Sequence, residues 1–353
     1  MYRHTYAKIN VTNIKNNIEK IIRRNDNYDY YFGVVKAFCY GHDKLEAVKA
    51  IIDGGCNYLA VATLDEAVEV REEYKDIPIL CLGYIDKEYI KVAKENNITL
   101  TVNTVECAKE IVESKEKVKV HIKVNTGMNR LGLSTKEEID NAYNLLSDNG
   151  VEIEGIYSHI FDAASSDKTN KQFRKFGELV SKEILSNIKI VHIGASETIT
   201  NYEKPSFVNG CRLGIIMYGF TNDLSLNLQS TFSLYSKVLQ INTLSEGDTL
   251  GYSGAYVAKE GDKIAVICAG YADGIIRENT GRNVFINGRE YKIVGNICMD
   301  MLFALVDDKV KVNDEVVLLK DNEHIDSVSK HLHSIPYEVL CTVSKRVPRI
   351  IEK

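Results

Sequence analysis

The 353-residue chain lacks the features that would place it in a membrane or cross-link it by disulfide bonds. No apolar run approaches the length of a membrane span, and residues 1–8 contain no apolar stretch that could act as a signal peptide. The eight cysteines lie far apart and form no CxxC pair, as is typical of reduced thiols. We therefore expect a cytoplasmic protein that does not bind membranes.

The chain also lacks the signatures of several binding classes. Its formal charge of -5 leaves no basic excess for nucleic acid or for an acidic membrane surface. The histidines show no HExxH spacing, and His331-Leu332-His333 alone is more typical of a surface, so no metal site is predicted. What is present is an ordinary apolar and charged composition, in a chain long enough for two domains.

Short apolar segments alternate with amphipathic segments through the first two-thirds of the chain. The predicted strands are Tyr31–Lys36, Tyr58–Val61, Ile79–Leu82, Leu100–Val102, Val118–Asn125, Ile153–His159, Ile190–Gly194 and Cys211–Ile215. The predicted helices are Lys44–Asp53, Leu64–Glu73, Glu88–Asn96, Val105–Ser114, Lys136–Leu146 and Lys171–Ile184. Such alternation predicts parallel strands joined by right-handed crossovers. A doubly wound sheet is the alternative, but no GxGxxG follows the first strand, and the strand count favours a closed (β/α)8 barrel of the TIM type over residues 1–228.

The pattern changes after Leu228. Residues 230–241 are rich in strand-forming side chains. The strand candidates Val284–Ile286 and Tyr291–Ile293 flank a turn that contains Asn287-Gly288, a strong hairpin signal. One helix is predicted near residues 325–332. Residues 229–353 are therefore predicted to form a second, mainly β domain.

Lys36 ends the first apolar strand candidate, where its ammonium must reach the surface, find a counter-charge or lose its proton. Burial lowers the pKa of a lysine by up to about 3–5 units and makes a neutral amine available near neutral pH. Such an amine is what a Schiff base with pyridoxal phosphate requires. A lysine that extends from the strand end into solvent is the alternative.

Further candidate site residues lie at the carboxyl ends of predicted strands, where barrel enzymes place their active sites. They are Lys123 and Arg130 at and after the fifth strand, His159 at the sixth, Ser196 after the seventh, and Arg212 and Gly214 at the eighth. Ser196 precedes a helix start, so its hydroxyl and nearby amides could bind an anion, and Gly214 would allow a phosphate to approach the backbone. Their shared position at one rim favours a common site.

Five motifs follow one another between about Thr5 and Arg349. They are Val34-Val35-Lys36-Ala37-Phe38-Cys39-Tyr40-Gly41-His42, Lys123-Val124-Asn125-Thr126-Gly127-Met128-Asn129-Arg130-Leu131-Gly132, Gly270-Tyr271-Ala272-Asp273-Gly274, Cys298-Met299-Asp300 and Arg346-Val347-Pro348-Arg349. In this order they resemble the signature motifs of the alanine racemases, barrel enzymes that use pyridoxal phosphate. The resemblance implies an amino-acid racemase that interconverts L- and D-alanine, either for cell-wall biosynthesis or for catabolism.

The resemblance implies two bases. Lys36 would hold the cofactor and act on one face of the substrate's α-carbon, while Tyr271 would act on the other face, in contact with His159. Arg212, oriented by His192, would face the cofactor's pyridine nitrogen. A permanent positive charge there disfavours protonation of the ring and weakens it as an electron sink, which suits simple proton exchange.

The resemblance also implies binding roles and a partner. Arg130 and the backbone amide of Met299 would bind the substrate carboxylate, and Lys123, which often carries a CO2 adduct in this family, would position Arg130. The phosphate would be held by Tyr40, Ser196, Gly214 and Ile215. The family implies a homodimer with shared active sites, in which the β domain of one chain brings its tyrosine to the barrel of the other.

Several positions depart from the family pattern. Leu213, Ala195, Asn125, Asn296 and Lys345 stand where the family usually has proline, asparagine, aspartate, an entrance arginine and a tyrosine that borders the phosphate and substrate. The cofactor residues are kept while the pocket walls differ, so serine or another polar amino acid is an alternative substrate to alanine. A decarboxylase on the same barrel and a non-catalytic protein that binds pyridoxal phosphate are further alternatives, although the chain has no glycine-rich phosphate loop and keeps a full second domain.

Overall fold

The computed structural model describes residues 2–42 and 45–353, which divide into two units. The barrel unit consists of Ile14–Cys39 and Ala47–Leu228. The β unit consists of Met1–Asn13, Tyr40–Glu46 and Gln229–Lys353. The helix predicted at Lys44–Asp53 is found as α3 (Leu45–Asp53), and its first predicted residue lies outside the described residues.

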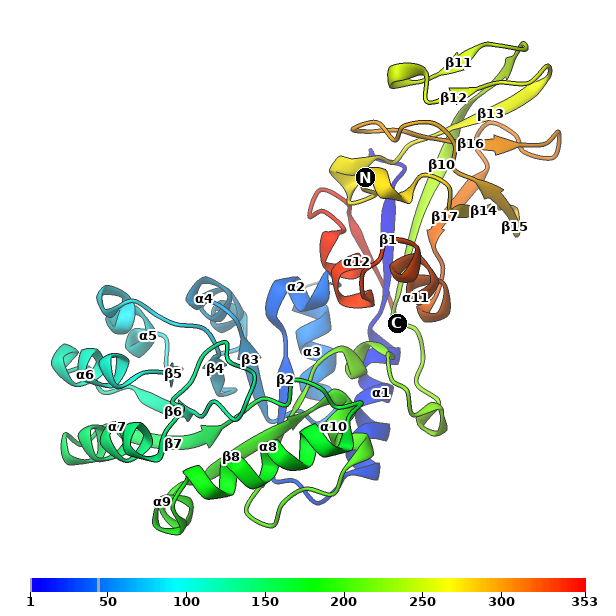
Figure 1. The fold of residues 1–353 in the computed structure, drawn as a ribbon. Coiled ribbons are helices and arrows are strands. Elements are labelled where there is room, and N and C mark those ends of the chain that lie inside the picture. The colour runs from blue at the N-terminus through cyan, green and yellow to red at the C-terminus, as the bar shows by residue number, and fades with distance from the viewer. Residues whose placement is uncertain (1, 43–44) are drawn as a thin grey trace. The chain divides into compact units, whose positions relative to one another are not determined.

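Eight parallel strands close into the predicted barrel (Figure 1). They are β2 (Tyr30–Val34), β3 (Tyr58–Val61), β4 (Ile79–Cys81), β5 (Ile98–Val102), β6 (Lys119–Lys123), β7 (Glu152–Tyr157), β8 (Ile190–Ala195) and β9 (Gly210–Leu213). Neighbours pair in parallel around the ring, and β9 pairs with β2 to close it. Residues buried on both faces of a parallel sheet give continuous apolar runs in the sequence. The barrel prediction is confirmed, and every predicted strand is found within two residues of its predicted ends.

Helices follow most of the barrel strands (Figure 1). They are α3, α4 (Leu64–Glu73), α5 (Ile90–Glu95), α6 (Val105–Ser114), α7 (Lys136–Asp148), α8 (Ser166–Leu179), α9 (Lys182–Asn187) and α10 (Ser196–Asn201). A further helix, α1 (Val11–Arg24), precedes the first barrel strand. The prediction of one helix at Lys171–Ile184 is wrong. Val180 is extended, and the hydroxyl of Ser181 accepts a hydrogen bond from the Ile184 amide, so a new helix begins there.

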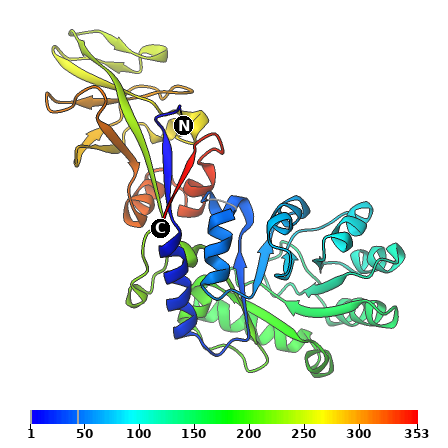
Figure 2. The same ribbon diagram turned by 180° about the vertical axis from the view of Figure 1, so that it is seen from behind.

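The β unit is built on an eight-stranded sheet. Its strands include β10 (Phe232–Leu244), β13 (Asp262–Ile267), β14 (Asn283–Ile286), β15 (Arg289–Lys292), β16 (Leu302–Val306), β17 (Glu315–Leu319) and β18 (Arg349–Glu352). The amino-terminal strand β1 (Tyr6–Asn10) completes the sheet, lying antiparallel to β10 and parallel to β18 (Figure 2). Dividing the sequence at residue 228 did not anticipate this pairing, because both partners of β1 are more than 200 residues away.

Local signals explain the remaining elements of the β unit. β11 (Thr249–Leu250) and β12 (Tyr256–Val257) form a small separate ribbon. The predicted hairpin is confirmed: Asn287 and Gly288, with φ of 51° and 75°, join β14 to β15 in the left-handed conformation that a tight hairpin turn requires. The predicted helix is found as α11 (Asn322–His331). A second helix, α12 (Pro336–Thr342), was not predicted, although proline at its first position is a helix-start signal. Among the described residues, no helix is long and apolar enough to cross a membrane.

Candidate active site

Lys36 is followed by an uncommon backbone conformation. Ala37, Phe38, Cys39 and Tyr40 all have φ between 51° and 58° and form one turn of left-handed helix, labelled α2 (Lys36–Tyr40). For residues with a Cβ atom this conformation costs about 1–2 kcal/mol each. Backbone strain of this kind is found where function fixes the chain. The Lys36 side chain is partly buried at the carboxyl end of β2.

Glu66 helps to hold this turn in place. Its Oε1 atom accepts a hydrogen bond of 2.7 Å from the Ala37 amide, and its Oε2 atom accepts one of 2.8 Å from the Ala62 amide. Glu66 also completes the capping box of α4 with Thr63. Glu66 lies in the first turn of α4, which follows the neighbouring strand β3. From there it fixes the backbone next to Lys36.

A group of positive side chains gathers at the carboxyl ends of the barrel strands. Lys123, at the end of β6, is only 6% exposed. Burial, together with the positive charges of Arg130, Arg212 and Lys36, lowers the pKa of Lys123 to about 8. The charges that lower this pKa are all positive, so the cluster favours anionic ligands.

The loop that follows β6 is held by Asn125. Its Oδ1 atom accepts hydrogen bonds from the amides of Gly127 at 3.1 Å and Asn129 at 3.0 Å. An amide oxygen serves this purpose as well as the carboxylate that is usual in the family. This departure therefore leaves the backbone that leads to Arg130 supported.

Arg212 lies at the centre of the cluster and is 3% exposed. Its Nη1 atom donates to His192 Nδ1 at 2.6 Å, and its Nη2 atom donates to His159 Nδ1 at 3.0 Å. The carbonyls of Ser158 and Ile193 accept two further bonds from Nη2. Burial and the surrounding cations, Arg212 first, lower the pKa of His159 to about 3, so this imidazole is neutral. The structure thus places His192 against Arg212, as expected, and also brings His159 to Arg212.

A line of buried polar groups continues from Arg212 into the barrel. Because Arg212 can only donate, His192 Nδ1 is an acceptor and its Nε2 atom carries the hydrogen, which it donates to His121 Nδ1 at 2.9 Å. His121 Nε2 then donates to Glu154 Oε2 at 3.4 Å, and the Tyr58 hydroxyl donates to the same oxygen at 2.7 Å. Although burial opposes ionisation, these hydrogen bonds hold the pKa of Glu154 at about 2. One tautomer is therefore specified for each histidine.

Because three buried histidines are neutral, we expect the folded protein to become less stable in mild acid. Burial lowers the pKa values of His121, His159 and His192, whereas an unfolded histidine titrates near 6.5. The stabilisation that the three neutral histidines provide is complete above pH 6.5. It is lost as the pH falls below 6.5, because the unfolded chain then binds up to about three more protons than the folded chain. We expect the urea-unfolding free energy to fall accordingly from pH 7 to pH 5. His121→Gln should reduce the slope by up to about one proton, and an unchanged slope in that variant would contradict the assignment.

The expected phosphate ligands of the barrel lie after β8 and β9. Ser196 is buried, and its hydroxyl accepts a 3.3 Å hydrogen bond from the Gly214 amide. Ile215 follows as the first residue of a buried 3-10 turn. The helix that Ser196 begins has only six residues, so it adds little dipole and any anion would depend on the hydroxyl and individual amides.

Four expected site residues belong to the β unit. Tyr271 begins the 3-10 turn η5 (Tyr271–Asp273) and is 42% exposed. Met299 is also exposed, and its carbonyl accepts a 3.0 Å hydrogen bond from the amide that follows Tyr271. Tyr40 is buried against the ring of Tyr337, and Lys345 is exposed. The functions of these four residues stay predictions.

The sequence analysis missed His121, Glu154 and Glu66. A signal for the first was present: Lys119, His121 and Lys123 alternate along β6, which places all three on one face of the strand. For Glu66, the signal was the capping-box spacing from Thr63. Glu154 had no local signal, because its role depends on partners from β3 and β6.

Comparisons with known proteins cover both units. Residues 9–222 match the family described as "Alanine racemase, N-terminal domain", and residues 231–351 match "Alanine racemase, C-terminal domain". An alanine racemase of Methanococcus maripaludis is 38% identical over 98% of this chain and 98% of its own length. A crystal structure of alanine racemase from Bacillus anthracis superposes with a TM-score of 0.93 at 30% identity, covering 100% of this chain and 96% of that chain. A histidine racemase from Leuconostoc mesenteroides superposes with a TM-score of 0.89 at 25% identity, covering 100% and 99% of the two chains.

With both units matched and the fold shared over the whole length, the chain is an amino-acid racemase. It belongs to the alanine racemase family.

Proposed function

We propose that this racemase interconverts L- and D-alanine with bound pyridoxal phosphate, using Lys36 and Tyr271 as its two bases. The observation that carries the proposal is the positive cluster around Arg212 at the strand ends of the barrel. Pyridoxal phosphate and an amino acid each bring an anionic group, a phosphate and a carboxylate. A desolvated cluster of lysine and arginine suits both.

The residues present fit this cofactor. Lys36 would hold it covalently, and Ser196, Gly214, Ile215 and Tyr40 would hold its phosphate. Buried Arg212, whose Nη atoms are fixed by two histidines, would lie at the pyridine nitrogen. The bound ring supplies an electron sink that makes the substrate's α-hydrogen acidic.

The protein's own groups would then move the protons. Lys36 would exchange a proton with one face of the α-carbon, and Tyr271 of a second subunit with the other. His159 accepts from Arg212 at Nδ1, so its Nε2 atom carries the hydrogen. A neutral His159 can donate that hydrogen to the Tyr271 oxygen and stabilise the deprotonated phenol.

Lys123 would support the substrate-binding arginine. With a pKa of about 8, a useful fraction of its amine is unprotonated at neutral pH. That neutral amine can add to CO2 and release one proton to give a carbamate. Relative to the ammonium form, which first loses a proton of its own, a positive charge beside Arg130 is replaced by a negative one. The carbamate would orient Arg130 toward the substrate carboxylate, which the Met299 amide would also bind.

One contact compensates for a departure from the family pattern at the site entrance and so supports alanine over larger substrates. Asn296, in the place of the family's entrance arginine, accepts a 2.8 Å hydrogen bond from Arg277 Nη2, so a guanidinium is kept beside this position. Lys345 is the departure that favours a polar substrate such as serine. A flexible, charged lysine side chain stands where the family has a tyrosine ring that borders the substrate. The assay must therefore include polar amino acids.

The test uses purified protein reconstituted with pyridoxal phosphate. Borohydride should fix the cofactor to the peptide that contains Lys36, and chiral chromatography should show racemisation of alanine with a higher kcat/KM than that of serine or histidine. Cofactor fixed to another peptide would overturn the assignment of Lys36. Release of CO2 without inversion would indicate a decarboxylase, and cofactor binding without turnover would indicate a non-catalytic homologue.

A further inference from the structure

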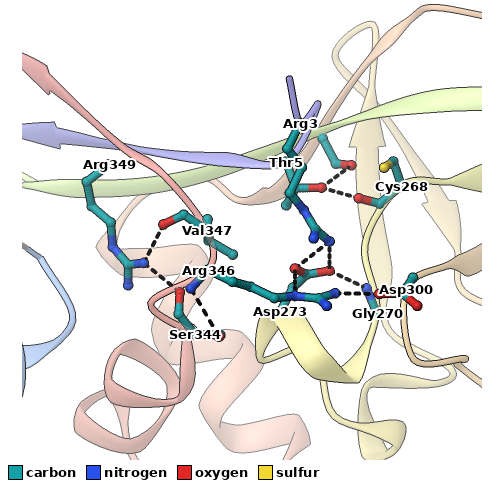
Figure 3. A network of polar contacts seen from close by, with 11 residues as sticks. Arg3, Thr5, Cys268, Gly270, Asp273, Asp300, Ser344, Arg346, Val347 and Arg349 are labelled. Carbon is teal, nitrogen blue, oxygen red and sulfur yellow. Dashed lines mark hydrogen bonds and ion pairs between the residues drawn. The ribbon is translucent and has the colours of Figure 1, made fainter. Parts of the chain in front are cut away.

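The carboxylate of Asp273 is fully buried in the β unit between two arginines (Figure 3). Arg3 Nη2 lies 2.5 Å from Oδ1 and 2.6 Å from Oδ2, and Arg346 Nε donates to Oδ1 at 2.9 Å. The Gly270 amide donates to Oδ2 at 3.0 Å. Both carboxylate oxygens are therefore engaged. Because a buried charge that loses a partner is strongly unfavourable, this arrangement fixes the carboxylate in one geometry.

Asp273 ends the same short turn that Tyr271 begins. The turn is also held by its backbone, since the amides of Tyr271 and Ala272 donate to the carbonyls of Cys298 and Met299, both at 3.0 Å. A Cβ atom at Gly270 would lie 2.3 Å from the Cys298 carbonyl oxygen, so the turn is pressed against this loop. Tyr271 is 42% exposed, which means that side-chain packing alone does not fix the position of its ring.

Arg346 joins this turn to the neighbouring loop. While its Nε atom donates to Asp273, its Nη2 atom donates to Asp300 Oδ1 at 2.7 Å, and Asp300 directly follows Met299 (Figure 3). The Ser344 amide donates to the Asp273 carbonyl at 3.1 Å. The segment around Arg346 thus supports the two loops that carry Tyr271 and Met299.

Arg3 reaches Asp273 from the segment that precedes β1. The position of this segment is fixed by Thr5, a fully buried residue whose hydroxyl lies 3.2 Å from that of Ser236 and bonds the Cys268 carbonyl. The side chain of Arg3 is 27% exposed, so most of it is buried in the β unit. Its ion pair is directed at the turn that carries Tyr271.

We propose that Asp273 is a positioning residue for the Tyr271 phenol and that Arg3 holds it in this role, so that the amino-terminal segment takes part in building the catalytic site. The inference rests on the proposed function of Tyr271 as one of the two bases. An aromatic base on a flexible turn would lose its alignment with the α-hydrogen, and a displacement of about 1 Å can cost as much as 100-fold in rate.

The test measures α-hydrogen exchange in D2O separately from each enantiomer, using holoenzyme. Tyr271→Phe serves as the reference that identifies the face served by the phenol. Arg3→Gln should slow exchange on that face by about 10-fold or more, with KM little changed, and leave exchange on the Lys36 face within about twofold. Arg3→Lys should restore part of the loss because it returns a positive charge.

Two further variants distinguish a loss of Tyr271 positioning from general damage to the β unit. Arg289→Gln breaks an exposed ion pair with Asp307 in the same unit and should leave both faces unchanged. Asp273→Asn should reproduce the one-sided loss. Equal losses on both faces in Arg3→Gln, or none, would overturn the inference. If Tyr271→Phe itself spares both faces, the proposed function of Tyr271 fails instead, whatever Arg3→Gln shows.

Discussion

Replacing Tyr271 with phenylalanine is expected to lower racemisation by about 10²–10⁴-fold while leaving the cofactor bound. The change removes one oxygen from a half-exposed side chain. The turn that carries it is held by backbone bonds to the Cys298 and Met299 carbonyls and by Asp273, so its shape does not depend on the phenol. The loss therefore reports proton transfer rather than folding.

The measurement follows the formation of each enantiomer from the other by chiral chromatography, with the absorbance of the bound cofactor recorded in parallel. Tyr252→Phe is the matched control, because Tyr252 is an exposed tyrosine of the same unit that no proposed role requires. Its rates should equal those of the wild type. Wild-type rates in both directions from Tyr271→Phe would rule out the two-base mechanism.

The barrel could be predicted because its information is local. Each strand is a short apolar run, and the apolar residues of each helix recur with helical spacing. Threonine caps such as Thr63 and Thr135 mark helix starts. Eight repetitions of that pattern leave few alternatives to a closed ring. The hairpin at Asn287-Gly288 was equally local.

Several of the features that were missed depend on partners far along the chain. β1 pairs with strands more than 200 residues away, and Arg3 lies 270 residues from Asp273. The left-handed turn after Lys36 contains no residue that favours positive φ before Gly41. It exists because surrounding groups such as Glu66 hold it, which no local pattern could reveal. Motifs thus named the candidate site residues, whereas the groups that support them became visible only in the fold.

Mixing two inactive variants is expected to restore activity if the enzyme is a homodimer with shared sites. Lys36→Ala removes the residue that would hold the cofactor, and Tyr271→Phe removes the opposite base, so each homodimer should be nearly inactive. In a hybrid dimer, one site receives both substitutions and the other receives neither. Because random exchange of equal amounts makes about half of the dimers hybrids with one intact site each, activity should recover to about a quarter of the wild-type value.

The exchange itself must be demonstrated for this result to be decisive. Chains with two different affinity tags allow hybrids to be purified, and their activity per dimer should be about half that of the wild type. The matched control mixes wild type with a double variant that carries Lys36→Ala and Tyr271→Phe in one chain. In its hybrids, one site lacks Lys36 and the other lacks the Tyr271 phenol, so these hybrids should be inactive. Purified hybrids of the two single variants that show no activity would mean that Lys36 and Tyr271 of one chain serve the same site, and the shared-site dimer would have to be abandoned.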